Sequence, residues 1–278
     1  MKVSEIKALV SLLDDSDQEV TNIVHTEINK LGEAVIPFLE EEWEGHEDNP
    51  PLQEKIENII HDMQYRTFVD GLLSWRDHRQ HDLLEGMYLV AKYQYPNLDF
   101  QQIKLAINQL YFDAWLQLRD EIHPDDAVKT LNHIFFNIHG YMANTKSFHS
   151  PANSMINQVM DTKRGNPISL CVIYMLVAQR LGLPIFGVNL PNIFVLTFKN
   201  PQTQFYINVF NSGQIYYKKD IDLHLKQLQI DPNERFYEPC SNMEIIRRTL
   251  LNLMVAFKKT DEQERVAELN SIYDKLIE

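Results

Sequence analysis

The sequence predicts an α+β protein that is predominantly helical, with one buried helix followed by a small antiparallel sheet. Apolar residues recur at helical spacing through the first half of the chain. The period falls to two after Gly182 and becomes helical again after Asp220. Residues 168–181 are apolar on nearly every face, and a helix of that kind must be buried centrally. We therefore expect helical extensions on both sides of a mixed core.

Short helices with tight connections fill the N-terminal part of the chain. Apolar side chains follow helical spacing in two segments before Gly32, and an Asp-rich turn at residues 14–17 joins these segments. A third helix is expected over residues 34–43, where three consecutive glutamates close it. Because pairs of short helices with such turns are typical of HEAT repeats, residues 1–65 are predicted to form a HEAT-like helical cap.

Longer helices are expected in the middle of the chain. Asn49-Pro50-Pro51 interrupts the first pattern. Helical spacing then resumes over residues 52–76, 82–93, 100–118 and 125–139. Glycine, asparagine, serine and proline mark a loop over residues 140–154. Asn166 followed by Pro167 supplies an N-cap and a proline at the first helical position, which predicts where the buried helix begins.

Four strands are predicted after the buried helix. Apolar and polar residues alternate over residues 185–190, 193–198, 204–210 and 214–217. The connections between them are short and rich in asparagine, proline and glycine, so successive hairpins predict an antiparallel meander. Helical spacing returns over residues 243–258 and 261–277. We therefore predict a core over residues 66–235 and a C-terminal helical hairpin over residues 236–278.

The composition argues against several classes of function. A net charge of −13 and a pI near 5.2 argue against binding to nucleic acid or to anionic membranes, because both require clustered lysine and arginine. The first ten residues lack the apolar stretch of a signal peptide, and no run approaches the roughly 20 apolar residues of a membrane span. Two cysteines make no disulfide framework, which favours the cytoplasm. No glycine-rich phosphate loop is present, and we expect no cofactor.

Two histidines of the predicted helical region are candidate metal ligands. His78 and His81 are three residues apart, are flanked by Asp77 and Asp82, and could share one helical face. A closed zinc site needs four ligands, and no cysteine pair accompanies these histidines. We therefore interpret them as residues on a solvated helix and expect no metal site.

A cysteine, Cys171, lies near the start of the predicted buried helix. A helix N-terminus favours a thiolate, and strands that follow the helix can present a histidine and an acid. This order of elements is the layout of papain-like and transglutaminase-like cores. Further residues resemble one family in particular, in order over residues 68–213: Tyr95-Pro96-Asn97-Leu98-Asp99, Leu131-Asn132, Phe135-Phe136, Gly140-Tyr141, Asn144, Pro151, Asn153-Ser154, Gly165-Asn166-Pro167-Ile168-Ser169-Leu170, Tyr174, Arg180-Leu181-Gly182-Leu183, Gly187-Val188, Pro191, Phe194, Phe210 and Gly213.

On these residues, the sequence resembles the bacterial transglutaminase-like family in which tetratricopeptide-like helices follow the core, the invasion-regulator-B-like proteins. The resemblance implies a site of cysteine, histidine and aspartate. In the family the segment after the second core strand reads Pro-Gly-His-Phe, whereas this chain has Pro191-Asn192-Ile193-Phe194, so Ile193 takes the place of the histidine. Asn208 takes the place of the aspartate. Cys171 is thus the one member of the implied site that is present.

Two interpretations of Cys171 are open on the sequence alone. It is either a nucleophile with a lowered pKa or a small apolar residue in a buried helix, where cysteine is common. A nucleophile needs a base, and Ile193 cannot accept a proton. His149 in the loop over residues 148–151 is the best candidate for a displaced base, ahead of His133 and His139, although a loop histidine is equally interpreted as a solvated residue.

The first functional hypothesis is a transglutaminase-like pseudoenzyme that binds a protein or peptide partner, or has a regulatory role, through its core cleft or its helical ends. The alternative is a cysteine hydrolase or acyltransferase that uses Cys171 as nucleophile with a displaced base such as His149. The surroundings of Cys171 separate the two hypotheses, because an enzyme requires an imidazole nitrogen within about 4 Å of the sulfur.

Overall fold

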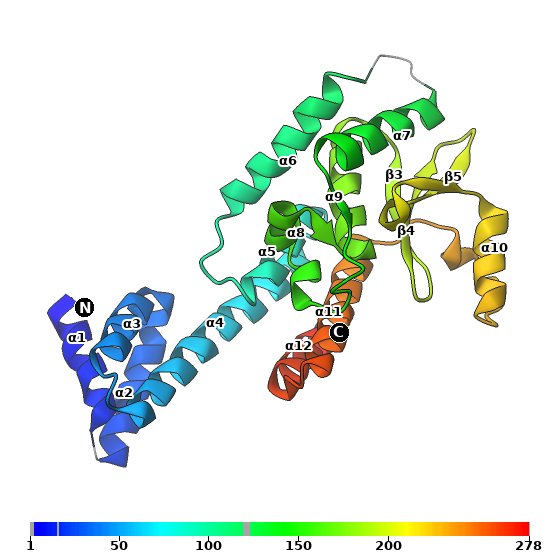
Figure 1. The fold of residues 1–278 in the computed structure, drawn as a ribbon. Coiled ribbons are helices and arrows are strands. Elements are labelled where there is room, and N and C mark those ends of the chain that lie inside the picture. Colours follow the sequence, from blue (N-terminus) through cyan, green and yellow to red (C-terminus); the bar gives the residue numbers. More distant parts are fainter. Residues whose placement is uncertain (1–2, 16, 119–122, 278) are drawn as a thin grey trace. The chain divides into compact units, whose positions relative to one another are not determined.

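The computed structural model describes residues 3–15, 17–118 and 123–277 and shows a mostly helical α+β protein, as predicted (Figure 1). The chain divides into two compact units, Met1–Gly71 and Leu72–Glu278. The boundary falls inside the long helix α4 (Pro50–His78), six residues beyond the predicted end of the helical cap. Each unit has its own core.

The first unit is a small helical bundle. Its helices are α1 (Val3–Ser11), α2 (Gln18–Leu31), α3 (Ile36–Gly45) and the first part of α4. Asp17 caps α2 by accepting a hydrogen bond from the backbone N–H of Glu19. The apolar stripes of the helices meet in one core, formed by Val10, Leu13, Val24, Ile28, Val35, Leu39, Leu52, Ile56, Ile59 and Met63. The helical character that the apolar periods predicted for this region is confirmed, and its HEAT-like character stays a prediction.

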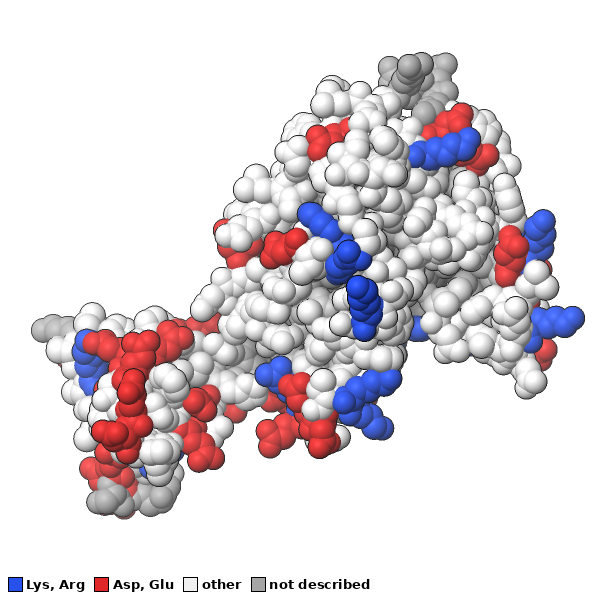
Figure 2. Space-filling view, in the orientation of Figure 1, with Lys and Arg blue, Asp and Glu red and all other residues white. Residues whose placement is uncertain are grey.

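Acidic side chains gather on the first unit, where Figure 2 shows Asp and Glu concentrated on the face that is drawn. Glu41, one of the three consecutive glutamates of α3, pairs with Lys7 at 2.6 Å. Both side chains are at least half exposed, and such surface pairs contribute at most about 1 kcal/mol. We interpret this acidic surface as a solvated face.

In the second unit, helices surround a central helix and a sheet. The helices before the sheet are α5 (Leu83–Lys92), α6 (Phe100–Trp115), α7 (Pro124–Asn132), α8 (Ile156–Thr162) and α9 (Pro167–Arg180). The helix expected over residues 125–139 changes at His133 into a π-helix, η3 (His133–Ile138), for which the sequence carries no signal. No helix of the described ranges has both the length and the apolarity needed to cross a membrane.

Helix α9 is the centre of the second unit. Between Ile168 and Ala178 every side chain is buried except Leu176, which is partly exposed. The helix packs against α6, β3 (Ile185–Asn189), β4 (Phe194–Lys199) and α11 (Asn242–Lys259). The central burial inferred from its all-round apolarity is confirmed.

The sheet is an antiparallel meander in the order β3-β4-β5-β6, as predicted. Its last strands are β5 (Gln204–Asn208) and β6 (Gln214–Tyr216). Strand β5 ends two residues early because the side chain of Asn208 accepts a hydrogen bond from Asn211 N and caps a short 3-10 helix, η5 (Val209–Asn211). Two further strands, β1 (Met142–Ala143) and β2 (Arg164–Gly165), pair in parallel over two residues, too short a span for alternation to predict.

Two helices cover the two faces of the sheet (Figure 1). One face packs on α9, and the other packs on α10 (Lys218–Gln227), a helix for which the sequence predicted no bounds beyond the return of helical spacing after Asp220. Only Ile221 and Leu225 of α10 are buried, so its apolar stripe is too narrow to stand out from its charged residues. These two side chains meet one side of the sheet, which consists of Val188, Val195, Tyr206 and Tyr216.

The C-terminal hairpin consists of α11 and α12 (Gln263–Lys275) and belongs to the second unit. Helix α11 packs on α5, α9 and β3 as well as on α12. Ser241 begins it with a capping box, in which Glu244 accepts a hydrogen bond from Ser241 N at 2.8 Å. One wall of the core is therefore built by the last part of the chain.

A prediction about stability follows from two glycines with similar backbone angles. Gly213 (φ 73°) and Gly182 (φ 78°) are both left-handed, but a Cβ at Gly213 would come 2.1 Å from Asn132 Oδ1, whereas a Cβ at Gly182 meets no atom within 4 Å. We expect Gly182→Ala to cost about 1–2 kcal/mol of the free energy of unfolding through its backbone alone. Gly213→Ala should cost about 1–3 kcal/mol more through crowding. Urea unfolding of both variants measures the difference, and equal costs would contradict the contact with Asn132.

Candidate functional site

A network of buried amides lies in front of helix α9. The side chain of Asn144 donates to Asn153 Oδ1 at 2.8 Å. Asn153 in turn donates to two backbone carbonyls of the next loop, Ser147 O at 2.7 Å and Phe148 O at 3.0 Å. The network thus holds the loop over residues 147–150, which carries His149.

The same network extends into the first turn of α9. The side chain of Asn166 donates to Ser154 Oγ at 2.8 Å and accepts from Ser169 N at 3.0 Å, while Asn166 N donates to Ser169 Oγ at 3.1 Å. Asn166, Ser154 and Ser169 are all buried. The asparagines and serines that carry the family resemblance therefore have a structural task, which is to join the loop and the start of α9.

A cavity of about 130 Å³ opens between this loop and α9, and we call it the α9 cavity. Four segments line it: the loop, the first turn of α9, the turn into β4, and α11. Its lining residues are Phe148, His149, Ser150, Asn166, Pro167, Ile168, Asn192, Ile193, Phe194, Arg248, Asn252, Val255 and Ala256. The residues at the start of α9 that reach this cavity carry no nucleophilic group.

Cys171 lies in the second turn of α9 and does not line the α9 cavity. The residue is fully buried, and its thiol lies 3.7 Å from Phe194 O, to which it donates. Burial raises the pKa of this thiol, an effect that a hydrogen bond from the backbone of Val209 only partly opposes. The thiol is therefore held in its neutral form within the core.

Ile193 and Asn208 lie together on the other side of the sheet. They line a second depression, the α10 cavity, of about 350 Å³, together with Tyr216 and His224. Alternate residues of a strand point to opposite faces, and the neighbours Phe194 and Val209 are the residues that contact Cys171. The two positions that the resemblance assigns to the histidine and aspartate therefore adjoin α10, although Ile193 also reaches the α9 cavity.

The polar groups of the α10 cavity are already engaged with each other or with the backbone. Asn208 donates to Tyr216 Oη at 3.2 Å, and its carbonyl accepts from Asn211 N at 3.1 Å. His224 Nε2 lies 2.9 Å from Pro191 O, a geometry in which this nitrogen carries the proton and donates. Sequence reasoning missed His224, because helical spacing after Asp220 gave neither the bounds of α10 nor its position against the sheet.

His149 is placed at the α9 cavity, with its ring edge-on to Phe148 at a centroid distance of 5.0 Å. Of the other histidines considered as a base, His139 pairs with Asp113 of α6 at 2.8 Å, and His133 is exposed on η3. Neither of these two lines the α9 cavity. The structure thus places His149 at the cavity and Cys171 inside the core.

Arg248 and Asn252 of α11 are site residues that the sequence did not reveal, because polar residues on an amphipathic helix are normally solvated. Arg248 donates from Nη1 to Asn189 Oδ1 at 3.1 Å and is within 3.5 Å of Leu190 O. Burial lowers its pKa, although a guanidinium stays charged at neutral pH. A positive charge is therefore held at the wall of the α9 cavity.

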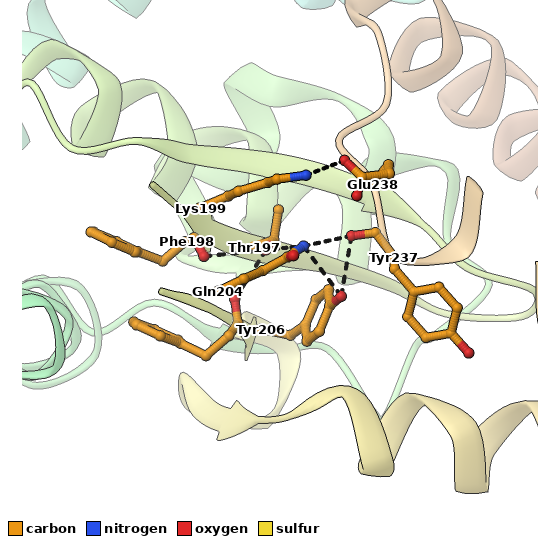
Figure 3. A network of polar contacts seen from close by, with 8 residues as sticks. Thr197, Phe198, Lys199, Gln204, Tyr206, Tyr237 and Glu238 are labelled. Carbon is orange, nitrogen blue, oxygen red and sulfur yellow. Dashed lines mark hydrogen bonds and ion pairs between the residues drawn. The ribbon is translucent and has the colours of Figure 1, made fainter. Parts of the chain in front are cut away.

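The chain segment before α11 is fastened to the sheet by a polar network, drawn in Figure 3. Gln204 donates to Tyr237 O at 2.8 Å, and Tyr206 Oη donates to the same carbonyl at 3.1 Å. Lys199 and Glu238 form an ion pair beside them. Because this network precedes α11 directly, it fixes the position from which Arg248 reaches the cavity.

Metal ligation is not indicated by the geometry of the described residues. Within the described ranges, no three or more His, Cys, Asp and Glu side chains gather as ligands. His78 ends α4 and His81 lies in the turn before α5, where its carbonyl accepts from Asn242 Nδ2 at 3.2 Å.

Comparison with known proteins agrees with this architecture. Residues 101–251 match the model of the transglutaminase-like superfamily. The chain belongs to this superfamily. The matched region begins in α6 and ends in α11, so it contains the amide network, α9, the sheet and most of the residues that line the α9 cavity.

Bacterial proteins are similar to this transglutaminase-like chain along most of their length. The UPF0162 protein of Xylella fastidiosa strain Temecula1 is 29% identical over 205 residues, which cover 70% of the chain and 72% of that protein. The UPF0162 protein YchA of Escherichia coli strain K12 is 26% identical over 187 residues, or 66% of the chain and 69% of that protein. A shorter match, 30% identical over 70 residues, links the chain to F-box only protein 21 of the mouse. No solved structure matches.

The burial of Cys171 predicts a slow reaction with iodoacetamide. A raised pKa leaves little thiolate at neutral pH, and the fully buried sulfur is not accessible to the reagent. In a Cys240→Ala variant, which leaves Cys171 as the only thiol, we expect no alkylation of the native protein within the time that completes it in denaturant. Mass spectrometry measures the alkylation of the native and of the denatured protein. Rapid labelling of the native protein would show an accessible, activated thiol.

The amide network predicts a large effect for Asn153→Ala. This change removes the buried side chain that bonds to Asn144 and to the part-buried carbonyls of Ser147 and Phe148, and a hydrogen bond lost at a buried site costs about 1–3 kcal/mol. Asn157→Ala is the matched control, because Asn157 is half-buried on α8 and its Oδ1 has no hydrogen-bond partner. We expect urea unfolding to show a loss several times larger for Asn153→Ala than for Asn157→Ala. Similar losses would exclude a stabilising role for the network.

Proposed function

We propose that this protein is a non-catalytic member of the transglutaminase-like superfamily that binds a peptide segment of a partner protein in the α9 cavity. The observation that carries the proposal is the separation of the thiol from the cavity. Pro167 and Ile168 line the α9 cavity at the start of α9, whereas Cys171 is fully buried and does not line it.

Catalysis by a cysteine requires a thiolate with a base in hydrogen-bond reach. The thiol of Cys171 has a raised pKa and donates to a backbone carbonyl, Phe194 O. Ile193 stands where the family has its histidine, and Asn208 uses its amide on Tyr216 and Asn211. These contacts favour the pseudoenzyme over the hydrolase or acyltransferase that would use Cys171 with His149.

Binding needs features that the α9 cavity retains. Apolar side chains with a few convergent polar groups are typical of ligand sites, and here Ile193, Phe194 and Ala256 adjoin the amides of Asn192 and Asn252. The rim is apolar as well, because Phe148 and Val255 are 45% and 50% exposed. An extended peptide could place one side chain in the cavity and its backbone against the amides.

The position of α11 also supports a docking role. The α11–α12 hairpin is the part of the chain that the resemblance identifies as tetratricopeptide-like, and α11 supplies one wall of the α9 cavity. Cys171 and Cys240 are both free, in agreement with a protein that works in the reducing cytoplasm. We infer a regulatory partner protein rather than a substrate that is chemically changed.

A pair of tryptophan variants tests the proposal. Val255→Trp fills the rim of the α9 cavity, whereas Leu251→Trp adds the same side chain one turn earlier on α11, at an exposed residue that does not line the cavity. Each immobilised protein is incubated with a pool of N-acetylated hexapeptides of randomised sequence, and mass spectrometry quantifies the retained peptides. We expect at least a tenfold loss of retention for Val255→Trp, on the order of one lost hydrophobic anchor, and none for Leu251→Trp.

Two results would contradict the proposed function. One is retention that is equal in the two tryptophan variants, or absent in the native protein. The other is hydrolysis or acyl transfer of pool peptides by the native protein that is lost on Cys171→Ala, which would assign the chemistry to the thiol.

A further inference from the structure

We propose that Arg248 receives the C-terminal carboxylate of the bound peptide, so that the ligand of the α9 cavity is the free C-terminus of a partner chain with an apolar last residue. The inference deepens the proposed function and rests on it. It begins from a guanidinium that lies at the cavity wall without an anionic partner.

The hydrogen-bond partners of Arg248 among the described residues are neutral. Its hydrogen bonds go from Nη1 to Asn189 Oδ1 and Leu190 O, and among the described residues none forms an ion pair with it. Glu244 lies one turn earlier on α11, but its carboxylate caps the helix by accepting from Ser241 N at 2.8 Å. The nearest carboxylate on the same helix is therefore in use.

The neighbouring cavity also contains carboxylates that are already bonded and guanidiniums that have no carboxylate partner among the described residues. Arg248 also lines a polar cavity of about 470 Å³, the α11 cavity, which contains two arginines and two glutamates. Glu238 pairs with Lys199 and Glu244 caps α11, whereas Arg235 stacks on Phe236 and has no carboxylate partner in the part of the chain that the structure describes. Both carboxylates are thus occupied, and both guanidiniums are available.

A half-buried guanidinium without a counter-charge favours an anionic ligand. Burial removes water from Arg248, and an arriving carboxylate would restore the lost interaction energy. A guanidinium has five N–H donors in a planar fork that fits a carboxylate with two parallel hydrogen bonds. Of the three guanidinium nitrogens, only Nη1 bonds to residues that the structure describes, so Nε and Nη2 are available for such a pair.

The residues beside Arg248 indicate what carries the carboxylate. Ile193, Phe194 and Val255 form an apolar wall of the α9 cavity, whose volume of about 130 Å³ fits one side chain rather than a large ligand. The amides of Asn192 and Asn252 adjoin the same space and suit a peptide backbone. A carboxylate, an apolar side chain and a peptide group at these positions together describe the last residue of a chain.

The test compares two forms of the same peptide pool. Randomised N-acetylated hexapeptides are offered to the native protein either as C-terminal free acids or as C-terminal amides. Since hydrogen bonds to charged groups contribute about 1.5–3 kcal/mol, we expect the free acids to be retained about tenfold or more over the amides. This comparison needs no variant and is independent of any effect of substitution on folding.

Two variants then assign the preference to one residue. Arg248→Met should abolish the preference for free acids. Lys258→Met removes the same charge from an exposed position of the same helix, outside both cavities, and should leave the preference unchanged. Circular dichroism of both variants establishes that they are folded.

The outcomes separate this inference from the function on which it rests. Equal retention of acids and amides by the native protein would overturn the role of Arg248 while peptide binding stands. A preference that persists in Arg248→Met would also overturn it, as would displacement of the free acids by equimolar inorganic phosphate, which would indicate a general anion site. Retention of neither pool would remove the proposed function itself.

Discussion

Helix α9 is surrounded by protein, so the polar groups at its start can be satisfied only by other protein groups. A helix leaves its first backbone N–H groups without partners, and buried polar groups that lack hydrogen bonds are costly. Here Pro167 removes one of those donors, Asn166 and Ser169 satisfy others, and Asn166 is itself bonded to Ser154. The loop held by Asn153 is part of the same network, so the position of α9, the loop and the cavity between them depend on one set of buried amides.

The amide network holds the start of α9 without any contribution from the thiol of Cys171. The amide network needs no thiolate, histidine or acid, and Cys171 serves the packing of α9 as a small apolar residue. With proline at the first helical position and isoleucine at the second, the start of α9 gives the cavity an apolar wall without a nucleophile. Arg248 and Asn252, two polar residues of the cavity lining, come from α11, an element outside the implied catalytic set.

The alternation of side chains along the strands decides where Ile193 and Asn208 lie, the two positions to which the resemblance assigns the histidine and the aspartate. Ile193 directly precedes Phe194, and Asn208 directly precedes Val209. Each faces the side of the sheet opposite to its neighbour, because successive residues of a strand alternate. Helix α10 covers that side of the sheet and supplies His224. His224 and Asn208 therefore share the α10 cavity. The hydrogen bond from His224 to Pro191 O ties α10 to the turn before β4, and the bond from Asn208 to Tyr216 joins β5 to β6.

The sequence by itself determined the order of helices and strands, the all-round burial of α9 and the antiparallel meander, because these follow from the local period of apolar residues. It also carries an isoleucine, Ile193, where the family resemblance implies a histidine. Tertiary structure alone decided that Cys171 is separated from the cavity, that α10 covers the second face, and that Arg248 reaches α9 from the end of the chain. These features join residues far apart in the sequence, and local periodicity carries no information about which distant side chains share a cavity.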